Sequence, residues 1–154
     1  MQSEKCLRPA KPEDAEIILK WRNDKTSREN SFNTMEIDLE SHLKWYTAKL
    51  LSDSCLMYIL EVESEPVAMV RGDLEKEICE ISYMVSPEKR GKGYGRLVIE
   101  LFEDELLISE ADIDTLVAFT KDTNEPSKKC FIGNGYTELS AGDIKCYIKN
   151  IGAR

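Results

Sequence analysis

The spacing of apolar residues changes along the chain, and each change predicts a different kind of element. Residues 5–8 predict a short first strand. Residues 12–24 open with a proline and acidic side chains, as helices do, and residues 38–51 predict a second helix after a polar, irregular loop at 26–35. The side chains that share one side of each helix are Ala15, Ile18, Leu19 and Trp21, then Leu39, His42, Leu43 and Tyr46.

From residue 55 onward the apolar residues take the shorter spacing of strands. The runs CLMYILEV, PVAMVRGDL and EICEISYMV are separated by acidic or Gly-Asp turns and predict an antiparallel meander. The later elements are predicted as a helix at 94–107, a strand at 114–120, a helix at 125–134, and strands at 136–139 and 143–149. This order predicts an α/β fold: a central, mixed, mostly antiparallel twisted sheet of about seven strands, flanked by four helices.

Length and composition narrow the class of protein. The 154 residues, without a repeat or a Gly/Ser linker, predict a single domain over residues 1–154. Apolar residues make up 42% and charged residues 32%, which is typical of a soluble globular protein. A formal net charge of −8 argues against nucleic acid or an anionic membrane as the main partner. The N-terminus has no apolar signal core, and no segment has the roughly 20 apolar residues of a membrane span.

Cysteine and histidine usage argues against a metal site. The five cysteines are scattered without CxxC spacing, and the chain has one histidine. We therefore expect no bound metal, no disulfide framework and a cytoplasmic location in which the thiols stay reduced.

The stretch VSPEKRGKGYG at 85–95 is the strongest chemical signal in the sequence. It lies between a predicted strand and a predicted helix, so free amides and the helix dipole can meet there. Glycines at 91, 93 and 95 remove Cβ atoms that would keep an anion from the backbone, and four basic side chains surround them. The mononucleotide pattern GxxxxGK[ST] and the Rossmann spacing are absent. The loop indicates a phosphate-binding site; the alternative is a solvated, lysine-rich turn.

Two motifs and the element order give the chain a resemblance to a known family. Residues 90–95, RGKGYG, closely resemble the [RQ]xxGx[GA] motif of the GCN5-related N-acetyltransferases (GNAT), and NEPSKKCFIGNGY at 124–136 resembles their Asn-containing segment. The resemblance implies a GNAT fold whose sheet is split at an acetyl-coenzyme A (acetyl-CoA) site. The cofactor-binding residues that it implies are Met84, Val85, Arg90, Gly91, Lys92, Gly93, Tyr94, Gly95, Arg96, Asn124 and Ser127.

The resemblance also implies direct transfer of the acetyl group to an amine, without an acyl-enzyme. Many members carry a tyrosine as general acid seven residues after the asparagine, where this chain has Phe131, so that role stays unassigned. Glu80 matches a region where some members carry a catalytic base; the alternative is a solvated strand glutamate. Tyr83 is a second catalytic candidate, with Ser82 as a further polar group near the thioester. Cys79 and Cys130 are expected to serve packing.

The run WRNDKTSRENSF at 21–32, followed by His at 42 and WY at 45–46, resembles acetyltransferases that modify the 4-amino group of nucleotide-linked amino sugars, of the pseudaminic acid pathway type. This resemblance implies that Arg22 and His42 face the nucleotide, and that Trp45 or Phe32 forms an apolar wall. The other residues that it implies on the substrate side are Asn23, Asn30, Ser31 and Arg71. Alternatives are a protein N-terminal acetyltransferase of the ribosomal-protein type, a polyamine or antibiotic acetyltransferase, and a catalytically silent acetyl-CoA-binding regulatory module. His42 can equally be a structural histidine, and a homodimer stays open.

Overall fold

The computed structural model of the protein describes residues 4–110 and 112–152. Its centre is a seven-stranded sheet in the order β1-β2-β3-β4-β5-β7-β6. Neighbouring strands pair antiparallel except β4 and β5, which are parallel. The strands are β1 (Lys5–Pro9), β2 (Cys55–Val62), β3 (Glu65–Glu75), β4 (Ile78–Val85), β5 (Thr115–Lys121), β6 (Thr137–Ala141) and β7 (Ile144–Asn150). The predicted α/β fold and the antiparallel meander β2–β3–β4 are confirmed.

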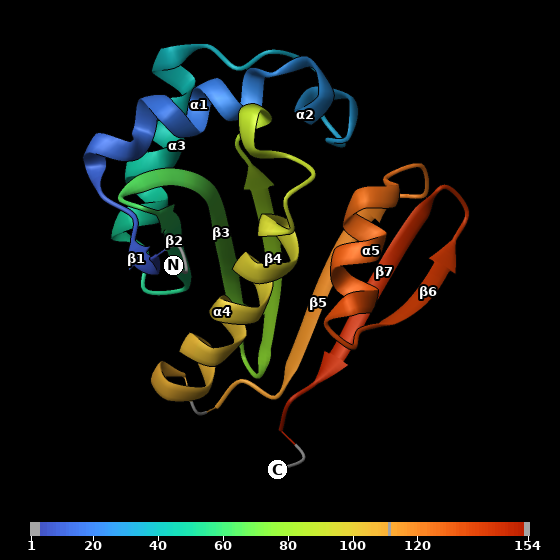
Figure 1. Cartoon of the computed structure of the whole chain (residues 1–154). Coiled ribbons are helices and arrows are strands. Elements are labelled where there is room, and N and C mark those ends of the chain that lie inside the picture. Colours follow the sequence, from blue (N-terminus) through green and yellow to red (C-terminus); the bar gives the residue numbers. More distant parts are fainter. Residues whose placement is uncertain (1–3, 111, 153–154) are drawn as a thin grey trace.

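Helices cover both faces of this sheet (Figure 1). One core cluster packs α1 and α3 against one face, and a second packs α4 and α5 against the other. The helices are α1 (Ala15–Asn23), α2 (Lys25–Glu29), α3 (Leu39–Leu51), α4 (Tyr94–Ser109) and α5 (Glu125–Gly133), with short 3-10 turns η1 (Pro12–Asp14) and η2 (Pro87–Lys89). The sheet is therefore the middle of three layers (Figure 1).

Strand β3 shows the consequence of two covered faces. Ala68 and Val70 pack into the cluster beneath α4, while Met69 between them packs into the cluster beneath α1, and all three are at most 3% exposed. A strand that is buried on both faces reads as a continuous apolar run rather than an alternating one. Each such side chain contributes roughly 1.5–3 kcal/mol when fully buried, so β3 anchors the sheet from which the site is built.

The sheet is split between β4 and β5. Their pairing is short: Ile78–Glu80 lies opposite Thr115–Val117. Figure 1 shows the two strands side by side at this end and diverging toward the other. On its other edge, β4 stays paired with β3 as far as Val85. The ladder between β4 and β5 therefore stops after Glu80, and the edge of β4 that faces β5 has no strand partner beyond that point.

Helix α2, which the sequence did not predict, lies over the open end of this split (Figure 1). The segment 26–35 was predicted to be irregular, but its first part belongs to α2, so the prediction of four helices is wrong. The five residues of α2 carry no apolar periodicity. The helix is held by Asp24, whose side chain accepts from the amides of Thr26 and Ser27. An N-cap can define a short polar helix that hydrophobic spacing does not reveal.

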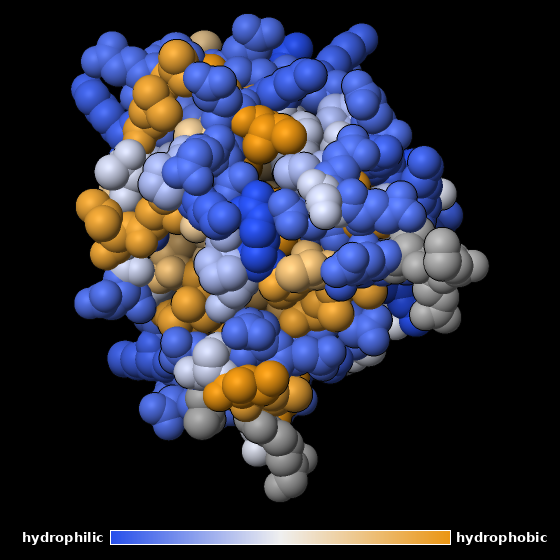
Figure 2. All heavy atoms as spheres, turned by 60° about the vertical axis from the view of Figure 1, so that its left-hand side comes forward, coloured by the Kyte–Doolittle hydropathy of each residue, from blue (hydrophilic) through white to orange (hydrophobic). Residues whose placement is uncertain are grey.

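Hydrophilic and apolar side chains are unevenly distributed over the surface (Figure 2). Figure 2 shows a face dominated by hydrophilic residues, with apolar side chains in small, separate groups. In the described ranges, no helix combines the length and apolar character that crossing a bilayer requires.

Candidate active site

The glycine-rich loop leads into the N-terminus of α4. Gly91 and Gly93 adopt positive φ angles of 75° and 84°, a region that other residues rarely enter. A Cβ atom at either position would meet no atom within 4 Å, so the space in front of the loop is open. Gly93 is the N-cap of α4, and in the described part of the chain no side chain caps the helix there. The first amides of α4, at residues 94–96, therefore lack an intrahelical acceptor.

These amides border a cavity of about 570 Å³ that also reaches β4 and α5. Four cationic residues line it, and no acidic residue of the described ranges does. These residues are Lys89, Arg90, Arg96 and Lys129. Hydrogen bonds to an ionised group contribute roughly 1.5–3 kcal/mol each, so amides, dipole and cations together suit a pyrophosphate. Met84 and Val85 bring the unpaired edge of β4 to the same cavity, where an amide-bearing arm can pair with it. We name this space the donor cavity.

The far wall of the donor cavity comes from the first turn of α5. Asn124 is the N-cap, and its Oδ1 accepts from the amide of Ser127 at 3.3 Å. The Oγ atom of Ser127 lies 2.8 Å from the Oη atom of Tyr83 on β4, which ties the two sides of the split together. Gly95 lets α4 approach this pair, because a Cβ there would lie 2.9 Å from the sulfur of Cys130 and 3.1 Å from the Tyr83 ring.

A second cavity, of about 300 Å³, lies between α1, α3 and strands β3 and β4. Apolar walls come from Ile18, Trp45 and Met69. Its charged lining residues are Arg22 and Arg71, and no Asp or Glu within the described ranges lines it. The cavity is therefore positively charged in a protein whose formal net charge is −8. We name it the acceptor cavity.

The two arginines of the acceptor cavity are held differently. Arg71 lies over the Trp45 ring, with 5.0 Å between its Cζ and the ring centroid, and its Nε donates to Asp73 at 3.0 Å. Arg22 donates from Nη2 to the carbonyl of Asn33 at 2.6 Å, whereas its Nη1 is buried and has no partner among the described residues. Burial, and then the charge of Arg28, lower the pKa of Arg22, although a guanidinium stays protonated near neutral pH. Arg22 thus lines the acceptor cavity and has one buried guanidinium nitrogen that no described protein atom satisfies.

The donor and acceptor cavities meet at three residues. Ser31, Tyr83 and Met84 line both of them. Ser31 Oγ donates to the carbonyl of Ser27 at 2.7 Å, and Met84 carries no polar side-chain hydrogen. Of these three residues, Tyr83 is therefore the best candidate to donate a hydrogen bond to a reacting group at the junction.

His42 is in the wall of the acceptor cavity but is only 3% exposed. Its Nε2 lies 2.7 Å from the carbonyl of Ala15, so that nitrogen donates, and its ring stacks on Tyr46 at a centroid distance of 5.7 Å. Burial lowers the pKa of His42, which keeps the imidazole neutral. These contacts join α3 to α1, and they fit the structural role better than a contact with a charged nucleotide.

The structure does not bring every predicted site residue to a cavity. The side chain of Asn23 donates to the carbonyl of Ile37 and accepts from the amide of Ile37, each at 2.8 Å. It lines neither cavity. Lys92 is exposed and lies outside the lining of the donor cavity. Asn30 lines the donor cavity instead of the acceptor cavity. Glu80 is exposed on β4 opposite Asp73 and lines neither cavity, so it can act on an acceptor only through water.

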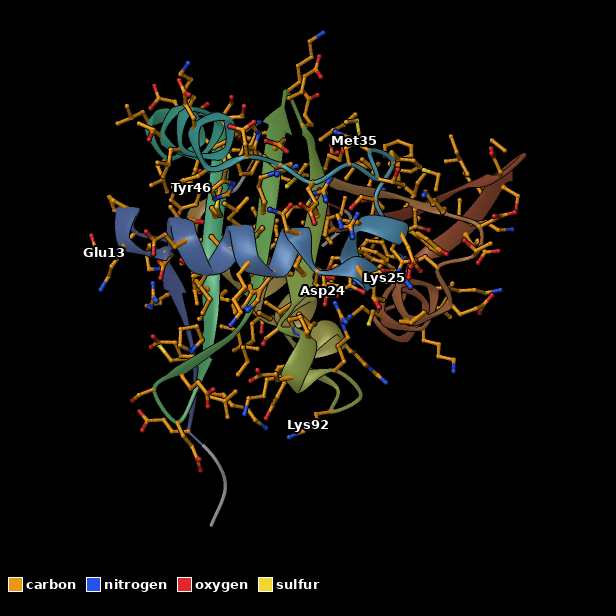
Figure 3. The ribbon with its side chains drawn as sticks, turned by 90° about the horizontal axis from the view of Figure 1, so that it is seen from above. Glu13, Asp24, Lys25, Met35, Tyr46 and Lys92 are labelled. Atoms are coloured by element: carbon orange, nitrogen blue, oxygen red, sulfur yellow. The ribbon has the colours of Figure 1, made fainter. Side chains whose placement is uncertain are left out.

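The sequence analysis did not assign some of the residues that line or support the site. Thr26 and Ser27 on α2 line the donor cavity, as does Cys130, which was assigned to packing. Asp24 joins α2 to the glycine loop through a 2.8 Å contact with Arg90. Figure 3 shows Asp24 where α1 passes into α2, above the ends of the central strands. The polar run DKTS is an N-cap signal that could have located α2, but nothing in it points to a partner 66 residues away.

No group of three histidine, cysteine or acidic side chains within the described ranges is arranged to hold a metal ion.

The acetyltransferase (GNAT) domain family matches residues 5–137. This match spans most of the chain, so the chain belongs to the GNAT acetyltransferases. The protein is an N-acetyltransferase, and its acyl donor is acetyl-CoA. None of the curated proteins matches the sequence.

Solved structures show the same fold at low sequence identity. A domain from Methanocaldococcus jannaschii has a TM-score of 0.86 and 18% identity, with 97% of this chain and 100% of that chain covered. A Salmonella typhimurium acetyltransferase that modifies the N-terminal serine of ribosomal protein L7/L12 has a TM-score of 0.81 and 15% identity, with 96% of this chain and 95% of that chain covered. Spermidine N-acetyltransferase from Vibrio cholerae, in complex with CoA and spermine, has a TM-score of 0.83 and 15% identity, with 95% of each chain covered. These likenesses support the fold; the acceptor must be argued from this chain.

Proposed function

We propose that the acceptor is the 4-amino group of a nucleotide-linked amino sugar used in cell-surface glycan synthesis. The observation that carries the proposal is the charge of the acceptor cavity, where Arg22 and Arg71 face the space without a lining carboxylate among the described residues. A nucleotide-linked sugar brings a diphosphate, the group that guanidinium forks bind best. The five cysteines are free thiols, in keeping with the cytoplasmic location that we propose for this activity.

The buried donor of Arg22 supports a ligand with an anionic oxygen. A buried polar atom without a partner costs free energy, and a hydrogen bond to a charged acceptor offsets that cost. Nη2 of the same guanidinium is fixed on the Asn33 carbonyl, so Nη1 is held in place before the ligand arrives. The aromatic face of Trp45 beside Arg71 adds an apolar surface on which a sugar or base can lie.

The reaction that we propose is direct attack at the junction of the two cavities. The acceptor nitrogen forms a bond to the thioester carbonyl carbon, the carbon–sulfur bond breaks, and the sulfur leaves with the electron pair. The proton lost by the nitrogen passes to water, with Glu80 as the nearest predicted base, acting through solvent. A sugar amine is less basic than a lysine amine, so a larger share of it is neutral at pH 7 and needs no strong base.

The alternatives differ in the charge that they ask of the acceptor cavity. A polyamine carries several positive charges, which Arg22 and Arg71 repel. An N-terminal peptide is compatible with the fold, as the Salmonella neighbour indicates, but it gives the buried donor of Arg22 no anion unless its sequence supplies one. A silent acetyl-CoA-binding module needs no acceptor cavity. We therefore rank the nucleotide-linked amino sugar first.

An acceptor panel tests this proposal. Purified protein and acetyl-CoA are mixed in turn with a UDP-linked 4-amino sugar, an N-terminal serine peptide and spermidine, and the free thiol is followed. We expect turnover with the nucleotide-linked sugar and little with spermidine. Turnover confined to the peptide or to spermidine would overturn the assignment of the acceptor.

A further inference from the structure

Breaking the carbon–sulfur bond leaves negative charge on the sulfur of CoA, and this chain lacks the tyrosine that the family resemblance implies for that step. The position where the resemblance implies a tyrosine is Phe131, which has no hydroxyl. Phe131 is 1% exposed, and its ring packs against Tyr136 and Tyr147, each at a centroid distance of 5.1 Å. Helix α5 therefore provides no phenol to the leaving group.

A phenol is nevertheless present at the junction, on the opposite side of the split. Tyr83 comes from β4 and lines both cavities, where the donor and the acceptor must meet. Two helices pack against its ring. The ring meets the Phe131 ring of α5 edge-on, at a centroid distance of 5.8 Å, and α4 approaches it closely at Gly95. The ring position is therefore fixed by packing before any ligand binds.

The hydroxyl of Tyr83 is oriented by Ser127. The Oη and Oγ atoms lie 2.8 Å apart, and Ser127 is itself fixed by its amide on the Asn124 side chain. Either hydroxyl can donate in this pair. When Ser127 donates, Oη accepts, and the phenolic hydrogen is free to point at a third atom. Without a ligand, the sulfur of Cys130 is one such partner, and a ligand atom in the donor cavity, which Tyr83, Ser127 and Cys130 all line, is another.

We propose that the Tyr83 hydroxyl donates a hydrogen bond to the sulfur of CoA as the carbon–sulfur bond breaks, and that Ser127 is the positioning residue for this hydroxyl. The nitrogen–carbon bond forms, the sulfur leaves as a thiolate with the electron pair, and the proton of the amine goes to water. Tyr83 keeps its own proton throughout. The proposal rests on the use of acetyl-CoA and is independent of which amine is acetylated.

The surroundings of Tyr83 explain why it stabilises the thiolate without protonating it. Burial, and then the neighbouring Cys130, raise the pKa of Tyr83 above its ordinary value. Tyr147 on β7 adds to this increase. Burial raises the pKa of the Cys130 thiol, whereas the contact with Tyr83 and the charge of Arg96 on α4 lower it. An ordinary thiol has a pKa of about 8.5, far below that of this phenol, so the proton stays on oxygen. A donor of this kind acts like the hydrogen-bond donors that stabilise developing oxyanions.

The pKa of the CoA thiol in the binary complex tests the proposal without any acceptor. The thiolate is followed by its ultraviolet absorbance as pH is raised, with CoA bound to wild type, Tyr83→Phe, Ser127→Ala or Cys146→Ala, and with desulfo-CoA as the blank. We expect the bound thiol pKa to be lowest in wild type and higher by about one unit, a tenfold change in the dissociation constant, in Tyr83→Phe. Ser127→Ala should fall between them. Cys146→Ala, on β7 and outside both cavities, is the matched control and should have the wild-type value.

Equal thiol pKa values in wild type and Tyr83→Phe would overturn the proposal, as would a shift of the same size in Cys146→Ala. Should Tyr83→Phe fail to fold, Ser127→Ala carries the test, and an unshifted thiol in that variant counts against the proposal. CoA affinity, measured on the same samples, separates loss of binding from loss of the hydrogen bond. Failure of the amino-sugar assignment leaves this titration unchanged, so the two proposals can fail separately.

Discussion

The guanidinium of Arg90 and the carboxylate of Asp24 lie 2.8 Å apart, joining the glycine loop to the cap of α2. Arg90 also donates to Ser27 Oγ at 3.0 Å, and Lys121 at the end of β5 donates to the carbonyl of Glu29 at 2.7 Å. Helix α2 is thus tied to both sides of the split sheet. The hydrogen bond from Arg90 is the main cause that lowers the pKa of Asp24, so the carboxylate stays ionised and competes with an incoming pyrophosphate for the same cation.

Replacing Asp24 with Asn is therefore expected to tighten the binding of CoA. Asn caps a helix as well as Asp does, so α2 should persist while Arg90 is released. Exposed ion pairs contribute about 0.2–1 kcal/mol, which corresponds to a decrease in Kd of about five-fold at most. Titration calorimetry with CoA gives the value. Glu29→Gln removes the same charge from the other end of α2 and should leave the Kd unchanged; equal effects of both variants would point to net charge alone.

Gly93 offers a test of the donor cavity. A Cβ at this position meets no protein atom within 4 Å, but it enters the space in front of the α4 amides and its φ of +84° is strained for alanine. We expect Gly93→Ala to raise the KM for acetyl-CoA about tenfold or more, with little change in the KM for the acceptor. Gly142, with φ of +66° and nothing within 4 Å of its Cβ, lies in the turn between β6 and β7. Gly142→Ala carries the same strain, about 1–2 kcal/mol, and should leave KM alone.

These examples show which features the sequence could predict. The glycine loop was predictable because its chemistry belongs to the backbone of consecutive residues and to the strand and helix that flank it. The attachment of helix α2 to the split sheet was not, because it depends on Arg90 and Lys121, which only the fold brings to the helix. The pair formed by Tyr83 and Ser127 spans 44 residues of sequence and likewise depends on the packing of α5 on the split sheet.

His42 makes folding stability depend on pH near neutrality. Burial lowers its pKa in the folded protein, while the unfolded chain titrates at about 6.5. Below that pH the unfolded state binds a proton that the folded state does not, so the free energy of unfolding should fall as pH decreases. Urea unfolding at about pH 7.5 and about pH 5.5 measures this difference. His42→Gln should show a smaller one, and an equal decrease in both proteins would mean that other groups cause it.

Arg22 is expected to control acceptor affinity. With a UDP-linked 4-amino sugar, Arg22→Gln should raise the acceptor KM by about 10- to 100-fold, the range for losing a hydrogen bond to a charged group, and leave the KM for acetyl-CoA nearly unchanged. Arg28→Gln is the matched control, because Arg28 holds the same loop through the carbonyls of Asn23 and Thr34 without lining the acceptor cavity. Similar losses in both variants would assign the effect to loop structure.

The most direct measurement compares one amino sugar with and without its nucleotide diphosphate as acceptor for the wild-type protein, under saturating acetyl-CoA. The positive acceptor cavity predicts that kcat/KM for the nucleotide-linked 4-amino sugar exceeds that for the free sugar by about 100-fold or more, mainly through KM. Equal values for the two sugars, or faster acetylation of spermidine than of either, would contradict an acceptor site built around an anion.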